Sequence, residues 1–169
     1  MAVLDTGSSS TIIDKGFAQH LGLPIVKGPY MKEVAYIDRQ ASYETSMVAF
    51  ELIGQDNQFR QNTVAETVEG FSKACFLVNW AQEIRKYSHL KNINVPSSPY
   101  PPLGVLLIGI DNVSLFEVYE KRVGTLLEPI GNLTPLGWAF MGNRQAQEES
   151  AQKFQSEIPA HTFKSQEDF

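Results

Sequence analysis

The hydrophobic and polar positions at the start of the chain predict short strands followed by a helix. Residues 2–4 are apolar and look like the end of a strand, and residues 11–13 predict a second short extended segment. Asp14 is a good N-cap for a short helix that continues through Leu21, and Gly22 supplies the left-handed residue that ends such a helix. The pattern therefore predicts strand, strand and helix in that order.

A long hairpin is predicted between residues 31 and 52. β-Branched and aromatic residues at 35–37 and 45–50 indicate its two strands. The polar stretch 38–42 separates them and is expected to form the tip.

Further elements are predicted downstream of this hairpin. Strands are expected at residues 58–66, 74–78, 105–109, 126–127 and 138–141, and helices at 80–87 and after Asp111. Four prolines between residues 96 and 102 indicate an exposed connection. From residue 143 the chain is rich in Gln, Glu, Ser and Lys, which is typical of a solvated helix or a disordered tail. We therefore expect one domain over residues 1–142 and a polar tail or linker over 143–169.

Composition and charge narrow the class of protein. The 169 residues suffice for one domain with a core, and no apolar run approaches the length of a membrane helix. The net charge of −5 argues against a nucleic-acid footprint, so neither a membrane nor a nucleic acid is an expected partner. The single Cys75 lies in an apolar run and is expected to be a buried thiol, which favours a reducing, intracellular and cytoplasmic location. The chain starts abruptly and without a signal peptide, so we expect it to be a fragment or a piece excised from a longer polyprotein.

The usual signatures of several enzyme classes are missing from the sequence. His20, His89 and His161 are scattered without a second ligand at metal-binding spacing, so we expect neither a metal nor a cofactor. No glycine-rich phosphate loop and no Gly-x-Ser-x-Gly elbow occur. A hydrolase that uses Ser8 or Ser9 remains a weak alternative.

The segment AVLDTGSSST, residues 2–11, contains the best candidate for chemistry. Its carboxylate, Asp5, directly follows an apolar strand, where burial is costly unless hydrogen-bond donors surround the acid. Gly7 leaves room for its backbone N–H to approach that carboxylate, and the hydroxyls of Thr6 and Ser8 are further donors. An ordinary turn, in which Asp5 accepts local N–H groups, explains the segment almost as well as a catalytic site does.

A second motif favours the interpretation of Asp5 as a catalytic residue. Leu107, Ile108 and Gly109 form an apolar-apolar-Gly segment about a hundred residues downstream of Asp5. Together with the apolar-Asp-Thr-Gly loop and the hairpin between them, this order of motifs resembles the retropepsin-like aspartic proteases. The segments 87–93, 105–112 and 134–142, the last containing Leu-Gly-Trp, are similar to the protease region of BEL/Pao-type retrotransposon polyproteins.

The resemblance implies a fold and a mechanism. The fold would be mainly β, with closed, barrel-like sheets, short helices and a flap hairpin, and with part of its N-terminal region upstream of residue 1. The enzyme would be an aspartic endopeptidase acting on extended polypeptide segments of a polyprotein, and its site would join the Asp5 carboxylates of a C2 homodimer. The flap would comprise Ile37, Asp38, Arg39, Gln40, Ala41 and Ser42.

The same resemblance assigns roles to the residues of the loop. Thr6 would lock the two active-site loops across the dimer, and Gly7 would offer backbone groups to the substrate. The Ser8 hydroxyl would bond the outer oxygen of Asp5. Leu107, Ile108 and Gly109 would form the strand behind the site.

Other features leave alternatives open. Asp111 could be a second catalytic acid, but without a Thr-Gly context it is expected to cap a helix or pair with an arginine. Trp80 and Trp138 are expected in the core. No glycine lies between Gly28 and Gly54, whereas retropepsin flaps carry glycines, and residues 79–102 form an insertion that would cover the sheet or bind a neighbouring domain. The competing interpretation is a catalytically inactive or domesticated protease-like module that serves dimerisation.

Overall fold

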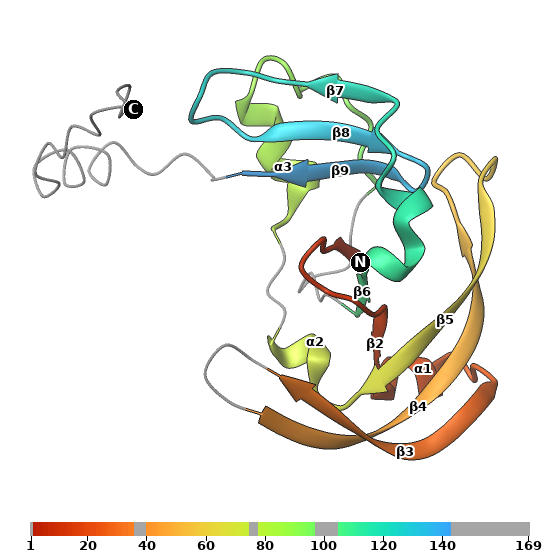
Figure 1. The fold of residues 1–169 in the computed structure, drawn as a ribbon. Coiled ribbons are helices and arrows are strands. Elements are labelled where there is room, and N and C mark those ends of the chain that lie inside the picture. The colour runs from red at the N-terminus through yellow and green to blue at the C-terminus, as the bar shows by residue number, and fades with distance from the viewer. Residues whose placement is uncertain (1, 36–39, 75–77, 97–104, 143–169) are drawn as a thin grey trace, which may run out of the picture.

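The computed structural model of the chain describes residues 2–35, 40–74, 78–96 and 105–142 (Figure 1). The described strands are β1 (Ala2–Leu4), β2 (Ile12–Asp14), β3 (Ile25–Ala35), β4 (Gln40–Ile53), β5 (Arg60–Val68), β6 (Leu106–Ile108), β7 (Glu120–Arg122), β8 (Ile130–Thr134) and β9 (Gly137–Met141). The described helices are α1 (Lys15–His20), α2 (Phe71–Ala74), α3 (Trp80–Glu83) and the 3₁₀ helices η1 (Ile84–Lys86) and η2 (Ile110–Phe116). The protein is therefore mainly β, as the sequence predicted.

The larger sheet brings both sequence motifs together. Among the described residues its strand order is β1-β6-β2-β5-β4-β3. β1 runs parallel to β6, with Val3 opposite Leu107, and β6 runs antiparallel to β2. β2 is in turn parallel to β5, which continues the sheet into the β3–β4 hairpin. Segments a hundred residues apart in sequence are thus neighbours at one end of the sheet.

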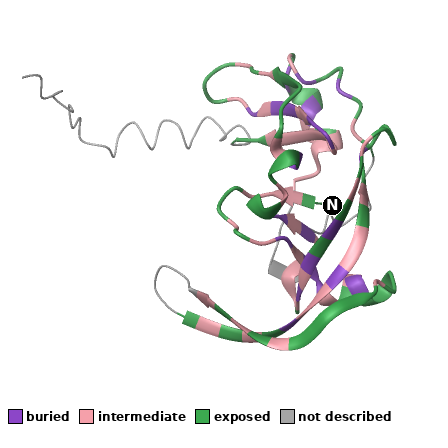
Figure 2. Ribbon diagram, turned by 45° about the vertical axis from the view of Figure 1, so that its right-hand side comes forward, coloured by how far each residue is buried: buried purple, intermediate pink, exposed green. Residues whose placement is uncertain are grey.

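The expectation of a closed, barrel-like sheet is wrong for the described residues. Closure requires the first and last strands of a sheet to hydrogen-bond with each other. Here β1 and β3 are the two ends of the strand order and do not pair. β3 and β4 instead curve away as a long arm (Figure 1). Figure 2 shows that much of the outer arm is exposed, whereas buried residues gather around β2, β5 and β6.

The helix after β2 forms as predicted. The Asp14 carboxylate accepts a hydrogen bond from the Phe17 backbone N–H at 3.0 Å, which caps α1. Gly22 adopts a φ of 63° beyond the end of the helix. The predicted strand at 74–78 is wrong where it can be checked, because Ala74 ends helix α2. The first turn of that helix is held by a second bond to Asp14, from the Ser72 N–H at 3.0 Å.

The hairpin is present but longer than predicted. β3 begins at Ile25, and β4 begins at Gln40, so residues 40–42 belong to a strand rather than to the tip. Ala41 pairs with Val34 and Ser42 with Glu33, because the antiparallel ladder continues into the polar stretch. The remaining flap positions, Ile37, Asp38 and Arg39, lie outside the described residues, as does Cys75.

A second sheet accounts for the late part of the chain. β7, β8 and β9 form an antiparallel three-stranded sheet in the described region (Figure 1). The strand predicted at 138–141 is confirmed as β9, but the one at Leu126 and Leu127 is wrong. Leu126 is 99% exposed, because this apolar pair lies in a turn between β7 and β8.

The described residues form two hydrophobic clusters. The main core consists of Ile13, Ala18, Val48, Ala65, Leu106, Ile108 and Leu115. The second core consists of Ile84, Tyr87, Leu90 and Ile93, against which Trp80, Val95, Trp138 and Phe140 pack. Trp80 stacks on Phe140 with ring centroids 4.9 Å apart, so both tryptophans contribute to packing, as expected. The described part of the predicted insertion therefore covers the three-stranded sheet.

The predicted helix at 80–87 is confirmed as α3 followed by η1. The tail at 143–169 lies outside the described residues. Within the described ranges, no helix combines the length and the apolar character needed to cross a bilayer.

Candidate active site

The loop after β1 presents the Asp5 carboxylate in a tight turn. The Asp5 N–H donates to the Ile108 carbonyl at 2.9 Å, which continues the β1–β6 pairing by one residue. The Asp5 carbonyl accepts from the Ser8 N–H at 3.3 Å and closes the turn. The Gly7 N–H donates to Asp5 Oδ1 at 2.8 Å, and no described residue donates to Oδ2. The half-buried Asp5 therefore has one oxygen fixed and one available.

The residues around Asp5 agree only in part with the sequence-based roles. A Cβ on Gly7 would lie 3.1 Å from Asp5 Oδ1, so glycine permits the close approach that was predicted. The Ser8 hydroxyl does not bond Asp5 but donates to the Ser10 carbonyl at 2.7 Å. The predicted hydrogen bond from Ser8 to Asp5 is therefore wrong, and Ser8 instead bonds the backbone of its own loop. Thr6 is exposed.

The apolar-apolar-Gly strand lies directly behind this loop. Leu107 and Ile108 are part of β6, and Gly109 follows it. A Cβ on Gly109 would lie 2.6 Å from the Ser10 carbonyl oxygen and 2.8 Å from that of Ser8. Any larger residue at this position would displace the loop, because the clash is with backbone rather than with a flexible side chain. The Ile110 N–H then donates to the Ser8 carbonyl at 2.9 Å.

Thr11 connects the loop to the segment after β6 and is almost fully buried. Its N–H and its hydroxyl donate to the two carboxylate oxygens of Asp111 at 2.9 and 2.7 Å. Its Oγ1 accepts from the Gly109 N–H at 3.2 Å and from Asn112 Nδ2 at 2.8 Å. Asp111 is therefore neither a helix cap nor an arginine partner, because its carboxylate is occupied by Thr11. The same bonds argue against a second catalytic acid at this position.

Sequence patterns did not predict this network, because Thr11 and Asp111 are a hundred residues apart. The available signal is a threonine that opens one apolar strand and an acid that follows the glycine ending another. That signal becomes specific only when the two strands are known to be neighbours.

A polar cluster joins the hairpin to the same loop and was also missed. Lys32 Nζ of β3 donates to Ser10 Oγ at 3.1 Å and forms an ion pair with Glu66 of β5. The Tyr30 hydroxyl donates to the other oxygen of Glu66 at 3.3 Å. Burial, followed by the charge of Glu66 and the hydrogen bond to it, raises the pKa of Tyr30 above its ordinary value. The phenol is therefore a neutral donor.

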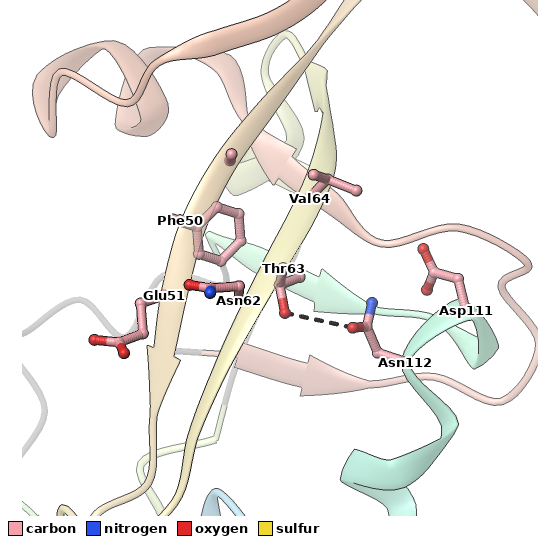
Figure 3. Close-up of a pocket in the computed structure, with 8 residues that line it drawn as sticks. Phe50, Glu51, Asn62, Thr63, Val64, Asp111 and Asn112 are labelled. Atoms are coloured by element: carbon pink, nitrogen blue, oxygen red, sulfur yellow. Dashed lines mark hydrogen bonds between the residues drawn. The ribbon is translucent and has the colours of Figure 1, made fainter.

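The hollow drawn in Figure 3 is separate from Asp5. It has a volume of about 520 Å³ and lies over β4 and β5, where Phe50, Asn62 and Val64 line it together with Asn112. Asn112 Oδ1 accepts from the Thr63 hydroxyl at 3.4 Å. Of the residues that line this hollow, Asp111 and Asn112 also bond Thr11 behind the loop.

A second hollow, of about 530 Å³, lies next to β1 and the Asp5 loop. β1 and Thr6 line it on one side, and Trp80, Trp138 and Phe140 line it on the other. It therefore separates the Asp5 loop from the three-stranded sheet.

Metal and serine chemistry gain no support from the described residues. No cluster of three metal-ligating side chains occurs among them. His89 Nε2 contacts the Pro129 carbonyl at 2.9 Å rather than a serine. His161 lies outside the described ranges. Among the described residues, the Ser8 hydroxyl donates to a carbonyl rather than to a basic side chain that could activate it.

No family model, no curated protein and no solved structure matches this chain. The functional argument therefore rests on the sequence motifs and on the geometry of the Asp5 loop.

Proposed function

We propose that the chain is a retropepsin-like aspartic endopeptidase that acts as a C2 homodimer. The observation that carries the proposal is the Asp5-Thr6-Gly7 turn, in which the Gly7 N–H holds one carboxylate oxygen at 2.8 Å. The second oxygen has no donor among the described residues, so it is available to a water or to a second carboxylate.

The order and pairing of the elements support the same class. An acid-bearing loop at the end of β1, a β3–β4 hairpin and a Gly-terminated β6 parallel to β1 occur in the order expected for retropepsin-like enzymes. Thr11, Gly109 and Asp111 fix the back of the loop through buried and part-buried hydrogen bonds. Such support is what a catalytic group needs, because a small misplacement of the reacting atoms lowers the rate.

The mechanism follows from two carboxylates that share one site. Two Asp5 side chains held close together cannot both ionise easily, so the pair binds one proton and titrates as a unit. The ionised member acts as a general base on a water that attacks the peptide carbonyl. The protonated member polarises that carbonyl and later gives its proton to the leaving amine.

The proposed substrate is an extended polypeptide segment, namely a cleavage site within a polyprotein. An extended segment binds by pairing with exposed strand edges, which supplies affinity through main-chain hydrogen bonds. β3 ends the strand order of the larger sheet and offers such an edge on the hairpin.

Replacement of Asp5 by Asn tests the proposal directly. Asp5→Asn removes the ionisable group and keeps the shape and one acceptor for the Gly7 N–H, so the fold should persist while peptide cleavage falls by at least about a thousandfold. Cleavage of peptides at acid pH, with circular dichroism for folding, measures both. Asp56→Asn, in an exposed turn, is the matched control and should leave cleavage unchanged.

Two results would overturn the assignment. Asp5→Asn cleaving as fast as the parent chain would exclude Asp5 as the catalytic acid. A stable dimer of the parent chain with no cleavage and no sensitivity to pepstatin would favour the inactive dimerisation module instead.

A further inference from the structure

The cluster of Lys32, Glu66 and Ser10 lies outside the acid-bearing turn and has no assigned role. The Lys32 side chain is 26% exposed and that of Glu66 only 13%, so this ion pair is partly buried, unlike the more exposed pair of Arg60 on β5 and Glu51 on β4. A partly buried pair keeps a defined geometry better than an exposed one, because water competes less for its partners.

The strand register places the Lys32 and Glu66 side chains on the same face of the sheet, offset by four residues along β4. Lys32 of β3 lies opposite Tyr43 of β4, and Glu66 of β5 lies opposite Met47 of β4. Tyr43 and Met47 are four residues apart on one strand and therefore share a face of the sheet. The lysine consequently reaches across β4 to the acid, while Glu66 also lies beside Ile12 of β2.

The cluster continues into the loop that carries Asp5. Lys32 Nζ donates to Ser10 Oγ at 3.1 Å, and the Ser10 carbonyl accepts from the Ser8 hydroxyl at 2.7 Å. The Ser8 N–H in turn donates to the Asp5 carbonyl at 3.3 Å. A continuous path of hydrogen bonds and short backbone links therefore runs from the hairpin to the candidate catalytic residue.

Stabilisation of the sheet alone does not account for this arrangement. The Lys32–Glu66 pair joins β3 to β5, but β4 lies between these two strands and already pairs with both of them. The bond to Ser10 instead reaches a residue outside the strands. Thr11 and Gly109 fix the loop from behind, and Lys32 is the described contact from the hairpin side.

We propose that Lys32 is a positioning residue that fixes the β3–β4 hairpin relative to the Asp5 loop. Its effect on cleavage rests on the proposed function: a peptide paired with the hairpin is held in line with the carboxylate only while hairpin and loop are coupled. Glu66 and Tyr30 orient the lysine, and Ser10 receives the contact.

Hydrogen exchange and kinetics on the full chain test the coupling. Lys32→Met keeps the length of the side chain but removes the charge and the donor. We expect amide exchange over residues 5–11 to rise about tenfold, and kcat/KM to fall about tenfold, mainly through kcat. Lys32→Arg, which keeps a cation able to reach Glu66, should recover most of both losses. Arg60→Met, which removes the exposed pair, is the matched control and should change neither.

Ser10→Ala separates coupling from stability. It removes the acceptor in the loop and leaves the Lys32–Glu66 pair in place, so it should reproduce the effects of Lys32→Met without a comparable loss of thermal stability. Unchanged exchange over residues 5–11 in both variants would overturn the proposal and leave Lys32 as a sheet-stabilising residue. A different result is a parent chain that cleaves no peptide while both variants still exchange faster than the parent over residues 5–11. That result would support the coupling and reject only the protease assignment.

Discussion

Thr11 shows how one side chain can satisfy several buried groups at once. A threonine hydroxyl has one donor and two acceptor positions, and here all three are used. The donor faces Asp111, and the acceptors receive the Gly109 N–H and the Asn112 amide. Valine has the same shape but none of this capacity, so the position demands a hydroxyl for reasons unrelated to packing.

Thr11→Val should therefore destabilise the protein by about 3 kcal/mol, because it strands several part-buried polar groups. Urea denaturation measures the change in the free energy of unfolding. Thr11→Ser restores the hydroxyl and should recover most of the loss. A valine variant within about 0.5 kcal/mol of the parent would mean that the network contributes nothing to stability.

At the residue scale, the sequence predicted contacts between near neighbours in the chain but not contacts between distant segments. The approach of the Gly7 N–H to Asp5 follows from three consecutive residues and was predicted correctly. The partner of Asp111 was not, because it depends on which strands are neighbours. Ser8 shows a third case: its hydroxyl was expected to bond Asp5 but donates to the Ser10 carbonyl, and the sequence alone could not rank these two nearby acceptors.

Among the elements, α1 and α2 depend on the same carboxylate. Asp14 Oδ1 accepts from the Phe17 N–H and Oδ2 from the Ser72 N–H, each at 3.0 Å. Burial raises the pKa of Asp14, but the hydrogen bonds from Ser72, Phe17 and Gly16 together outweigh it. The pKa of Asp14 therefore lies below its ordinary value.

The lowered pKa of Asp14 determines how the stability contributed by this cap depends on pH. A carboxyl with a lowered pKa in the folded state stabilises the protein above the unfolded pKa, and the contribution is lost as the pH falls through the lower folded pKa. Asp14→Ala should cost about 1–2 kcal/mol at neutral pH. The difference from the parent should shrink below about pH 4, the ordinary range of an aspartate. Urea denaturation of both proteins across pH 3–7 provides the test, and a difference that is constant with pH would contradict it.

Strands and helices were predicted correctly where an unbroken run of apolar residues or a pair of capping residues marks both ends of the element. The apolar run that became β6 and the Asp14-to-Gly22 pattern that became α1 carry their own boundaries. β8 was missed because its glycine and asparagine interrupt any alternation, although most of the strand is buried between β7 and β9. The Leu126-Leu127 turn was misread as a strand because composition alone does not show that an apolar pair is exposed.

At the scale of the whole molecule, the chain supplies half of the proposed site. Closure of the sheet was expected from the family resemblance and is not found in the described residues, where the sheet is open at β1 and β3. Asp5 follows β1 directly and so lies at one of these open edges. A carboxylate in a loop at such an edge can face the same residue of a second chain across a two-fold axis.

Mixing active and inactive chains tests whether two Asp5 residues form one site. If the parent chain is mixed with an equal amount of Asp5→Asn chain, random pairing makes only about a quarter of the dimers fully parental. Cleavage per total protein should therefore fall to about a quarter of the parent value, because a mixed dimer lacks one carboxylate. Asp56→Asn used as the partner should cause no loss. A fall to only about one half with Asp5→Asn would show that each chain cleaves independently, since simple dilution gives that value.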